Sequence, residues 1–169
     1  MKRINKEALF VLTAFIISFA FVNFICIALP ALKVTYETSS FLIEGKVEGL
    51  VATFGGTISN GSTTNNFNLL NAKYNSISLC GYLFPLLACI IALVAYAKKN
   101  QILYYFTGVI CLACGIITLL EGVIFSSVNN IASYGYEVSL LLGPIIGGIC
   151  GVLSAIACFG SWYIFNKQK

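Results

Sequence analysis

Histidine is absent from this 169-residue chain, and charged residues make up only 9% of it, against about 25% in a typical soluble protein. The missing histidine removes the commonest general base and metal ligand, and we expect neither a cofactor nor a metal site. No basic patch interleaved with aromatic residues lies outside the segments expected at the cytoplasmic side, so we expect no nucleic acid partner. The remaining composition is 59% hydrophobic, which is typical of an integral membrane protein. We therefore expect one membrane domain over residues 1–169, with the lipid bilayer around it.

Cysteine is missing from the long polar stretch 32–76. The seven cysteines all lie in apolar segments, as Cys26, Cys80, Cys89, Cys111, Cys114, Cys150 and Cys158. A secreted disulfide framework would place cysteines in the polar stretch, so we interpret the thiols as packing residues. A disulfide between Cys26 and Cys80 is kept as an alternative, because both are expected at a similar depth.

Four apolar segments are long enough to cross a hydrocarbon layer of about 30 Å. They are residues 8–29, 77–97, 102–125 and 138–165. A cleaved signal peptide is the alternative for the first segment, but its apolar run exceeds the roughly 7–15 residues of such peptides. The tight basic turn between the second and third segments makes them antiparallel neighbours. The predicted fold class is an all-α membrane protein, a left-handed bundle of four transmembrane helices.

Small residues recur at steps of three and four in the last three segments. The residues that we assign to helix packing are Gly81, Ala88, Gly108, Gly115, Gly122, Gly147, Gly151 and Ser154. Helices in lipid gain no hydrophobic energy from association, and they use small side chains to bring their backbones close together. We expect this pattern to form the inner surface of the bundle, and it leaves assembly into a homo-oligomer open.

The stretch 32–76 is the only sizeable region expected outside the membrane. Residues 33–37 alternate between apolar and polar side chains, which predicts a strand. Residues 41–43 and 51–54 are two further strand candidates, and Asn60-Gly61 is a strong signal for a hairpin turn. We therefore expect a small extracellular antiparallel β-sheet in this first outer loop.

Charge asymmetry predicts the orientation. Seven basic residues fall on the side of the two termini, namely Lys2, Arg3, Lys6, Lys98, Lys99, Lys167 and Lys169. Short cytoplasmic segments of membrane proteins carry an excess of lysine and arginine. We expect a multi-pass protein of the cell (plasma) membrane, with both termini in the cytoplasm and the stretch 32–76 outside.

Glu121 is the only charged residue inside a predicted span. An acidic residue within the membrane indicates a functional site by default, and Asn23 is expected at a similar depth. These two residues are the candidate polar site. The alternative interpretation is that Glu121 reaches the outer interface and pairs with Lys33 or Lys73.

The pair Cys111-x-x-Cys114 resembles the redox pair of four-span membrane thiol oxidoreductases, the quinone-coupled disulfide-forming enzymes and the vitamin K epoxide reductases. In those families the pair lies near an aqueous face and exchanges with cysteines of an outer loop. Here the pair is expected near mid-membrane and the loop has no cysteine. We interpret the pair as packing, and we expect no catalytic residue.

In topology, with four spans, a long strand-rich first outer loop and a short second one, the chain resembles the claudin and peripheral myelin protein group. That group carries a tryptophan and a cysteine pair in the first outer loop. Here the one tryptophan is Trp162 in the last span, and the loop lacks cysteine. The resemblance therefore implies an architecture but no site residues.

These observations predict a non-enzymatic scaffold or interaction protein of the cell envelope. Its contact surface for a protein partner would be the outer loop 32–76, above all the uncharged run 55–68. An accessory subunit of a transporter or an oligomeric channel, using Glu121, is the alternative. A membrane thiol oxidoreductase is the third interpretation.

Overall fold

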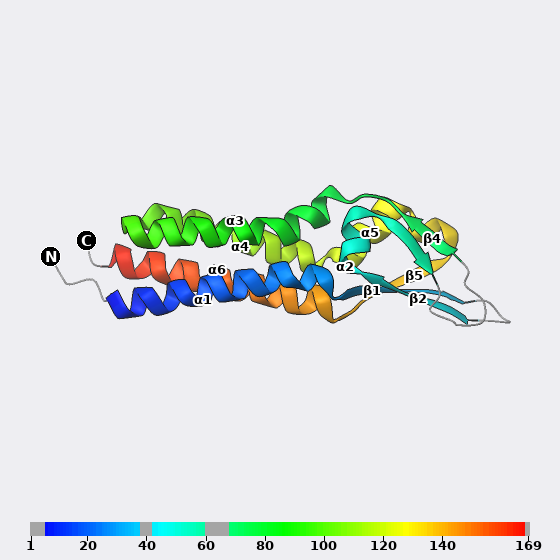
Figure 1. The fold of residues 1–169 in the computed structure, drawn as a ribbon, viewed down its shortest axis with the longest axis horizontal. Coiled ribbons are helices and arrows are strands. Elements are labelled where there is room, and N and C mark those ends of the chain that lie inside the picture. Colours follow the sequence, from blue (N-terminus) through cyan, green and yellow to red (C-terminus); the bar gives the residue numbers. More distant parts are fainter. Residues whose placement is uncertain (1–5, 38–41, 60–67, 168–169) are drawn as a thin grey trace.

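The computed structural model describes residues 6–37, 42–59 and 68–167. Its described part is mostly helical, and four long helices lie side by side in a bundle (Figure 1). These helices are α1 (Lys6–Ile25), α3 (Ser76–Lys98), α4 (Gln101–Leu119) and α6 (Leu142–Asn166). Each is long and apolar enough to cross a membrane, with a mean hydropathy between 2.1 and 2.5. The length and composition of these four helices thus indicate a multi-pass membrane protein.

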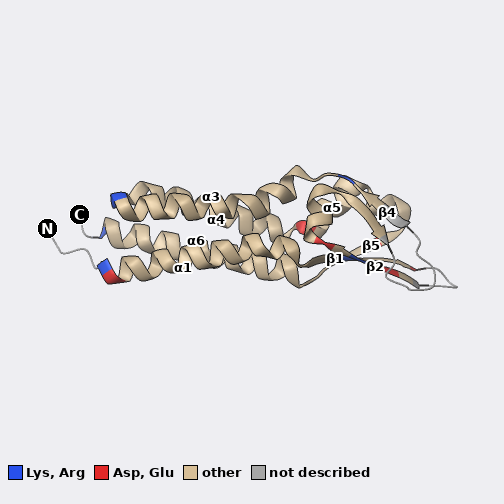
Figure 2. Ribbon diagram, in the orientation of Figure 1, with Lys and Arg blue, Asp and Glu red and all other residues tan. Residues whose placement is uncertain are grey.

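The bundle helices pack in the cyclic order α1, α3, α4 and α6, with α6 against both α4 and α1. Both chain ends lie at the same end of the bundle (Figure 1). Figure 2 shows basic residues at that end and few charges along the helices. The boundaries of the second span agree with the prediction to within one residue at each end.

The described residues beyond the other end of the bundle form a second structural region, which we call the outer module (Figure 1). A three-stranded antiparallel sheet has the order β2-β1-β5, and β3 pairs with β4 in a second, two-stranded sheet. The strands are β1 (Pro30–Glu37), β2 (Leu42–Glu48), β3 (Gly56–Ser59), β4 (Asn68–Ala72) and β5 (Tyr136–Leu140). Helices α2 (Gly49–Phe54) and α5 (Glu121–Asn129) and the 3-10 turns η1 (Cys26–Ala28) and η2 (Ile131–Tyr134) complete the module.

The outer module has its own apolar core. Leu32 and Val34 of β1 are fully buried there, together with Ala52 of α2 and Phe125 of α5. Sheet and helices therefore share one interior, and removal of this apolar surface from water is the main term that stabilises the module.

The predicted antiparallel sheet exists, but two of its details were wrong. The strand predicted at residues 33–37 is β1, whereas residues 51–54 belong to helix α2. Gly49 begins α2 by packing on η1, since a Cβ atom there would lie only 2.5 Å from the carbonyl oxygen of Ile27. The sheet is also not confined to the first outer loop, because β5 comes from the second. The predicted Asn60-Gly61 turn lies outside the described residues.

Two predicted span boundaries were wrong for one reason. The third helix ends at Leu119 rather than at residue 125, and the fourth begins at Leu142 rather than at residue 138. The apolar residues near these ends pack inside the outer module instead of facing lipid: Phe125 is fully buried, and Val138 and Leu140 pack on the same core. Hydrophobicity alone does not separate these two environments.

Candidate functional site: a buried polar cluster and an outer groove

Helices α4 and α6 meet backbone to backbone at two of the predicted packing residues. A Cβ atom on Gly151 would lie 2.7 Å from the Cα atom of Gly115. A Cβ atom on Gly115 would lie 2.9 Å from the carbonyl oxygen of Gly148 and from the amide nitrogen of Val152. No side chain fits between the two helices there, which is the close approach that small residues permit in membranes.

Most of the other predicted packing residues also lie between helices. Gly81 faces Ile117 of α4, and Gly108 faces Phe159 of α6, with ideal Cβ contacts of 2.8 Å and 2.9 Å. Ala88 is buried in a cluster with Cys111 and Ala155, and the Ser154 hydroxyl donates to the carbonyl oxygen of Ile16 at 3.3 Å.

Gly122 is different, because it lies in α5 of the outer module. A Cβ atom there would be 3.5 Å from a methyl carbon of Leu140, in ordinary contact. This glycine does not pack bundle helices together, and it lines the outer groove described below.

A buried polar cluster lies where the bundle meets the outer module. Its members have buried side-chain atoms without a hydrogen-bond partner in the described structure, and they are Asn23, Thr53, Asn75, Ser78, Tyr82 and Glu121. Buried polar groups are nearly always hydrogen-bonded in proteins, and each exception calls for a water, an ion or a functional reason. The concentration of such atoms at one level marks this junction as a candidate site.

Glu121 is the first residue of α5, directly after the chain bends at Leu120. Its side chain is 0% exposed, and neither carboxylate oxygen has a partner. The interpretation that Glu121 reaches the interface and pairs with Lys33 or Lys73 is therefore wrong. Lys33 pairs instead with Glu44 at 2.6 Å.

Two hydroxyl groups of α3 lie near the Glu121 carboxyl. Ser78 and Tyr82 are one helical turn apart on the same face, and both are fully buried. Burial raises the pKa of Glu121 from 4.5 to about 7, and the nearby Ser78 hydroxyl offsets part of that rise. The Ser78 hydroxyl and the Glu121 carboxyl lie close together without meeting hydrogen-bond geometry. The carboxyl therefore changes its protonation state close to neutral pH.

Asn23, the other predicted polar residue, lies between α1 and α6. Its Oδ1 atom is 2.8 Å from the position of a Cβ on Gly147, and its Nδ2 atom is 3.2 Å from that on Gly151. The two glycines thus leave space for the amide group. The structure places Asn23 beside α6 and Glu121 beside α3, at the same junction but against different helices.

The cysteines do not form a redox arrangement in the described residues. All seven are free thiols, so the alternative disulfide between Cys26 and Cys80 is wrong. Cys111 and Cys114 are buried in α4. The Cys114 thiol is directed at the backbone oxygen of Cys80 at 3.7 Å, which is a packing contact between α3 and α4.

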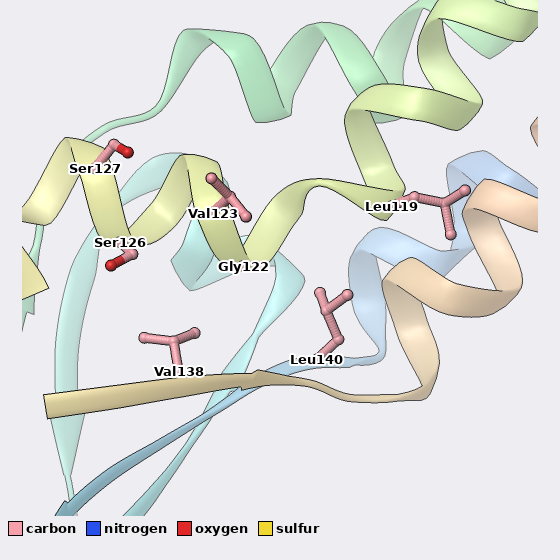
Figure 3. A pocket seen from close by; sticks show the side chains of 7 residues that line it. All are labelled: Leu119, Gly122, Val123, Ser126, Ser127, Val138 and Leu140. Carbon is pink, nitrogen blue, oxygen red and sulfur yellow. The ribbon is translucent and has the colours of Figure 1, made fainter. Parts of the chain in front are cut away.

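An open groove of about 500 Å³ runs between α5 and β5 (Figure 3). Val138 and Leu140 extend from β5 toward α5, and Leu119 closes the end next to the bundle (Figure 3). Gly122, Val123, Ser126 and Ser127 form the wall on the α5 side. The groove was not predicted, because it depends on β5, and residues 138–140 of this strand were predicted to begin the last transmembrane helix.

Strand β5 borders the groove at one edge of its sheet. Among the described strands its one neighbour is β1, in the register Leu32 to Leu140 and Val34 to Val138. From residue 137 to residue 140, the other side of β5 thus presents backbone groups that pair with no described strand, which is the arrangement that accepts an added strand.

No protein-family model matches this sequence, and no curated protein is significantly similar to it. The case for a function therefore depends on the groove, the sheet edge and the buried polar cluster.

Proposed function

We propose that this chain is a non-enzymatic interaction protein of the cell envelope, and that it binds another protein through the outer module. The observation that carries the proposal is the open edge of β5 beside an apolar groove. An extended segment that adds to a sheet edge gains affinity from backbone hydrogen bonds and specificity from pockets for alternate side chains. The open edge of β5 and the groove lie next to each other on the outer module.

The pattern of β5 defines the partner segment. Val138 and Leu140 face the groove, whereas Glu137 and Ser139, which alternate with them along the strand, are exposed. Side chains alternate along a strand, so every second residue of an added strand would enter the groove and should be apolar. A basic residue opposite Glu137 would gain a favourable cross-strand pair. The partner we propose is therefore a strand with alternating apolar and polar residues.

The contact surface that we propose, the edge of β5, differs from the run 55–68 that was predicted from the sequence. The run 55–68 lies partly outside the described residues, and its described strand β3 contacts β2. Because the sheet order is β2-β1-β5, β3 and the open edge of β5 lie on opposite sides of the sheet. The β5 edge has the groove as well, and for this reason we favour it.

Orientation follows from charge. Basic residues gather at the end of the bundle that holds the termini (Figure 2). The helix bounds place Lys6 at the start of α1, Lys98 and Lys99 at the end of α3, and Lys167 directly after α6. The excess of basic residues on cytoplasmic segments supports termini inside and the outer module outside the cell membrane. A partner would then be another envelope protein or an extracellular one.

The second candidate function is an accessory subunit of a transporter or of an oligomeric channel. The fully buried Glu121 favours it, because a buried acid at the end of the bundle with neighbouring hydroxyls is suited to handling protons or cations. A pore within one chain is not supported, since α4 and α6 touch at their backbones.

Site-specific photocrosslinking in native membranes tests the proposal. A photoreactive amino acid at Ser139 is expected to give a discrete protein adduct, whereas the same probe at the exposed Lys46 of β2 gives none. Val123 is 65% exposed at the groove wall, so Val123→Glu should weaken the adduct without a cost in folding. Equal adducts from both probe positions, or none from either, would contradict the proposal.

A further inference from the structure

The Glu121 carboxyl cannot remain charged in its present surroundings without compensation. It is fully buried, its two oxygens are unpartnered, and no ion pair involves it among the described residues. Transferring one unpaired charge from water into the protein interior costs several kcal/mol of free energy, and a buried carboxylate takes up a proton instead. Protonation is therefore the state in which this packing is stable.

A protonated Glu121 can also provide hydrogen-bond partners for the two neighbouring hydroxyls, which have none in the described structure. A carboxylic acid supplies one donor and further acceptor sites, and the hydroxyls of Ser78 and Tyr82 each supply a donor and acceptors. These three groups have enough donors and acceptors to form hydrogen bonds with one another, directly or through one buried water. An ionised carboxylate would accept bonds only and would add the cost of a buried charge.

We infer that Glu121, Ser78 and Tyr82 form a buried proton-binding site, in which a proton on the Glu121 carboxyl keeps α5 packed against α3. Glu121 is the first residue of α5, while Ser78 and Tyr82 lie in the first two turns of α3. The site thus joins a transmembrane helix to the outer module. Loss of the proton would require water to enter the junction and would loosen the first turn of α5.

The other titratable groups around α5 do not replace this role. Tyr82 is close enough to the Glu121 carboxyl for the two groups to interact, and Cys26 of η1 is likewise close to Tyr82; the side chains of Tyr82 and Cys26 are neutral at pH 7 when unperturbed. Of the other elements that pack on α5, β5 carries Tyr136 and Glu137, and η2 carries Tyr134; Glu137 and Tyr134 are exposed to solvent, and Tyr136 is half-buried. The last turn of α4 has no titratable residue. Glu121 is thus the group at this junction whose charge changes near neutral pH.

The proton site does not depend on the proposed partner. Its consequence can be measured in the purified protein, and it concerns the packing of α5 alone. Because α5 also forms one wall of the groove, a loosened α5 would alter the groove as well. The proton would then regulate the same surface that we propose for binding.

Hydrogen exchange of the α5 amides in detergent micelles tests the inference. The carboxyl has a pKa of about 7 when buried and 4.5 when exposed. Linkage then predicts that the opening equilibrium of α5 increases about tenfold from pH 6 to pH 8, after correction for intrinsic exchange. Glu121→Gln, which stays neutral, should abolish this increase and keep α5 protected at pH 8. Glu137→Gln is the matched control and should retain the wild-type increase.

Infrared spectroscopy of the wild-type protein gives a second readout that does not require a variant to fold. A carbonyl band of a protonated carboxylic acid should be present at pH 6 and should disappear as the pH rises through about 7. An unchanged tenfold increase in Glu121→Gln would overturn the inference. So would the absence of a protonated carboxyl band from the wild-type protein at pH 6.

Discussion

Gly151→Ala is the smallest change that tests the packing of the bundle. The added Cβ atom would lie 2.7 Å from the Cα atom and 2.9 Å from the amide nitrogen of Gly115 on α4. Both are backbone atoms, so no side-chain rotation can relieve the contact. One methyl group therefore has to push α4 and α6 apart along part of their length.

Two opposing effects determine how much Gly151→Ala changes the free energy of unfolding. Replacing a helical glycine by alanine stabilises a helix by about 1 kcal/mol, whereas an added methylene in a tightly packed interior costs about 1–3 kcal/mol. Here the obstacle is backbone, so we place the steric cost at the upper end of that range. We expect a net loss of about 1–2 kcal/mol in the free energy of unfolding, and a larger loss for Gly151→Leu.

Gly160→Ala is the matched control on the same helix. Its Cβ atom would lie 3.9 Å from a methyl carbon of Leu12, which is ordinary contact. The propensity gain should then dominate, and the stability should stay equal or increase by up to about 1 kcal/mol. The assay is unfolding in mild detergent followed by circular dichroism, with the monomer checked by size-exclusion chromatography. If Gly151→Leu unfolds like the wild type and stays monomeric, the close α4–α6 contact is refuted.

Further contacts give predictions that the same assay can check. The hydroxyls of Thr13 and Tyr104 share a hydrogen bond of 2.7 Å inside the bundle, and Tyr104→Phe should cost about 1 kcal/mol. The Asn129 side chain accepts a hydrogen bond from the Lys73 amide at 2.7 Å and donates one to the carbonyl oxygen of Phe125 at 3.0 Å. Asn129→Ala should cost about 1–3 kcal/mol and increase amide exchange at Lys73, because a buried donor or acceptor loses its partner. Unchanged stability in both variants would show that these bonds do not order the bundle and the module.

The spans could be predicted from the sequence because their signal is local. A run of apolar residues longer than the hydrocarbon layer has few alternatives to a transmembrane helix. The spacing of glycines also indicated where helices approach, as at Gly115 and Gly151. Neither inference required knowledge of which segments meet in the folded chain.

The outer module could not be predicted in the same way, because it depends on contacts between distant segments. Val138 and Leu140 continue the apolar run of the last span, and their pairing with β1 is a contact with a distant segment that this run does not indicate. The alternation at Tyr136, Val138 and Leu140 was a signal that could have identified the strand. Missing β5 also meant missing the groove and the open sheet edge.

Of the two interpretations of Glu121, the interface one was wrong, and the functional one stays a prediction. The isolated position of Glu121 in an apolar run indicated a functional residue, but its depth along a straight helix indicated the interface. The chain bends at Leu120, and the outer module covers the side chain that a straight helix would have exposed. The neighbours Ser78 and Tyr82 come from another helix and carry no signal of their own.

The most direct test of this account is the side of the membrane on which the outer module lies. Single cysteines at Ser139 of β5 and Asn166 of α6 can be probed with a membrane-impermeant maleimide, because six native thiols lie within the apolar bundle helices and Cys26 is buried in the turn η1. In intact cells, Ser139→Cys should be labelled, and Asn166→Cys should be labelled only after the membrane is permeabilised. Labelling of Asn166→Cys but not of Ser139→Cys in intact cells would contradict the account, since the proposed docking edge would then face the cytoplasm.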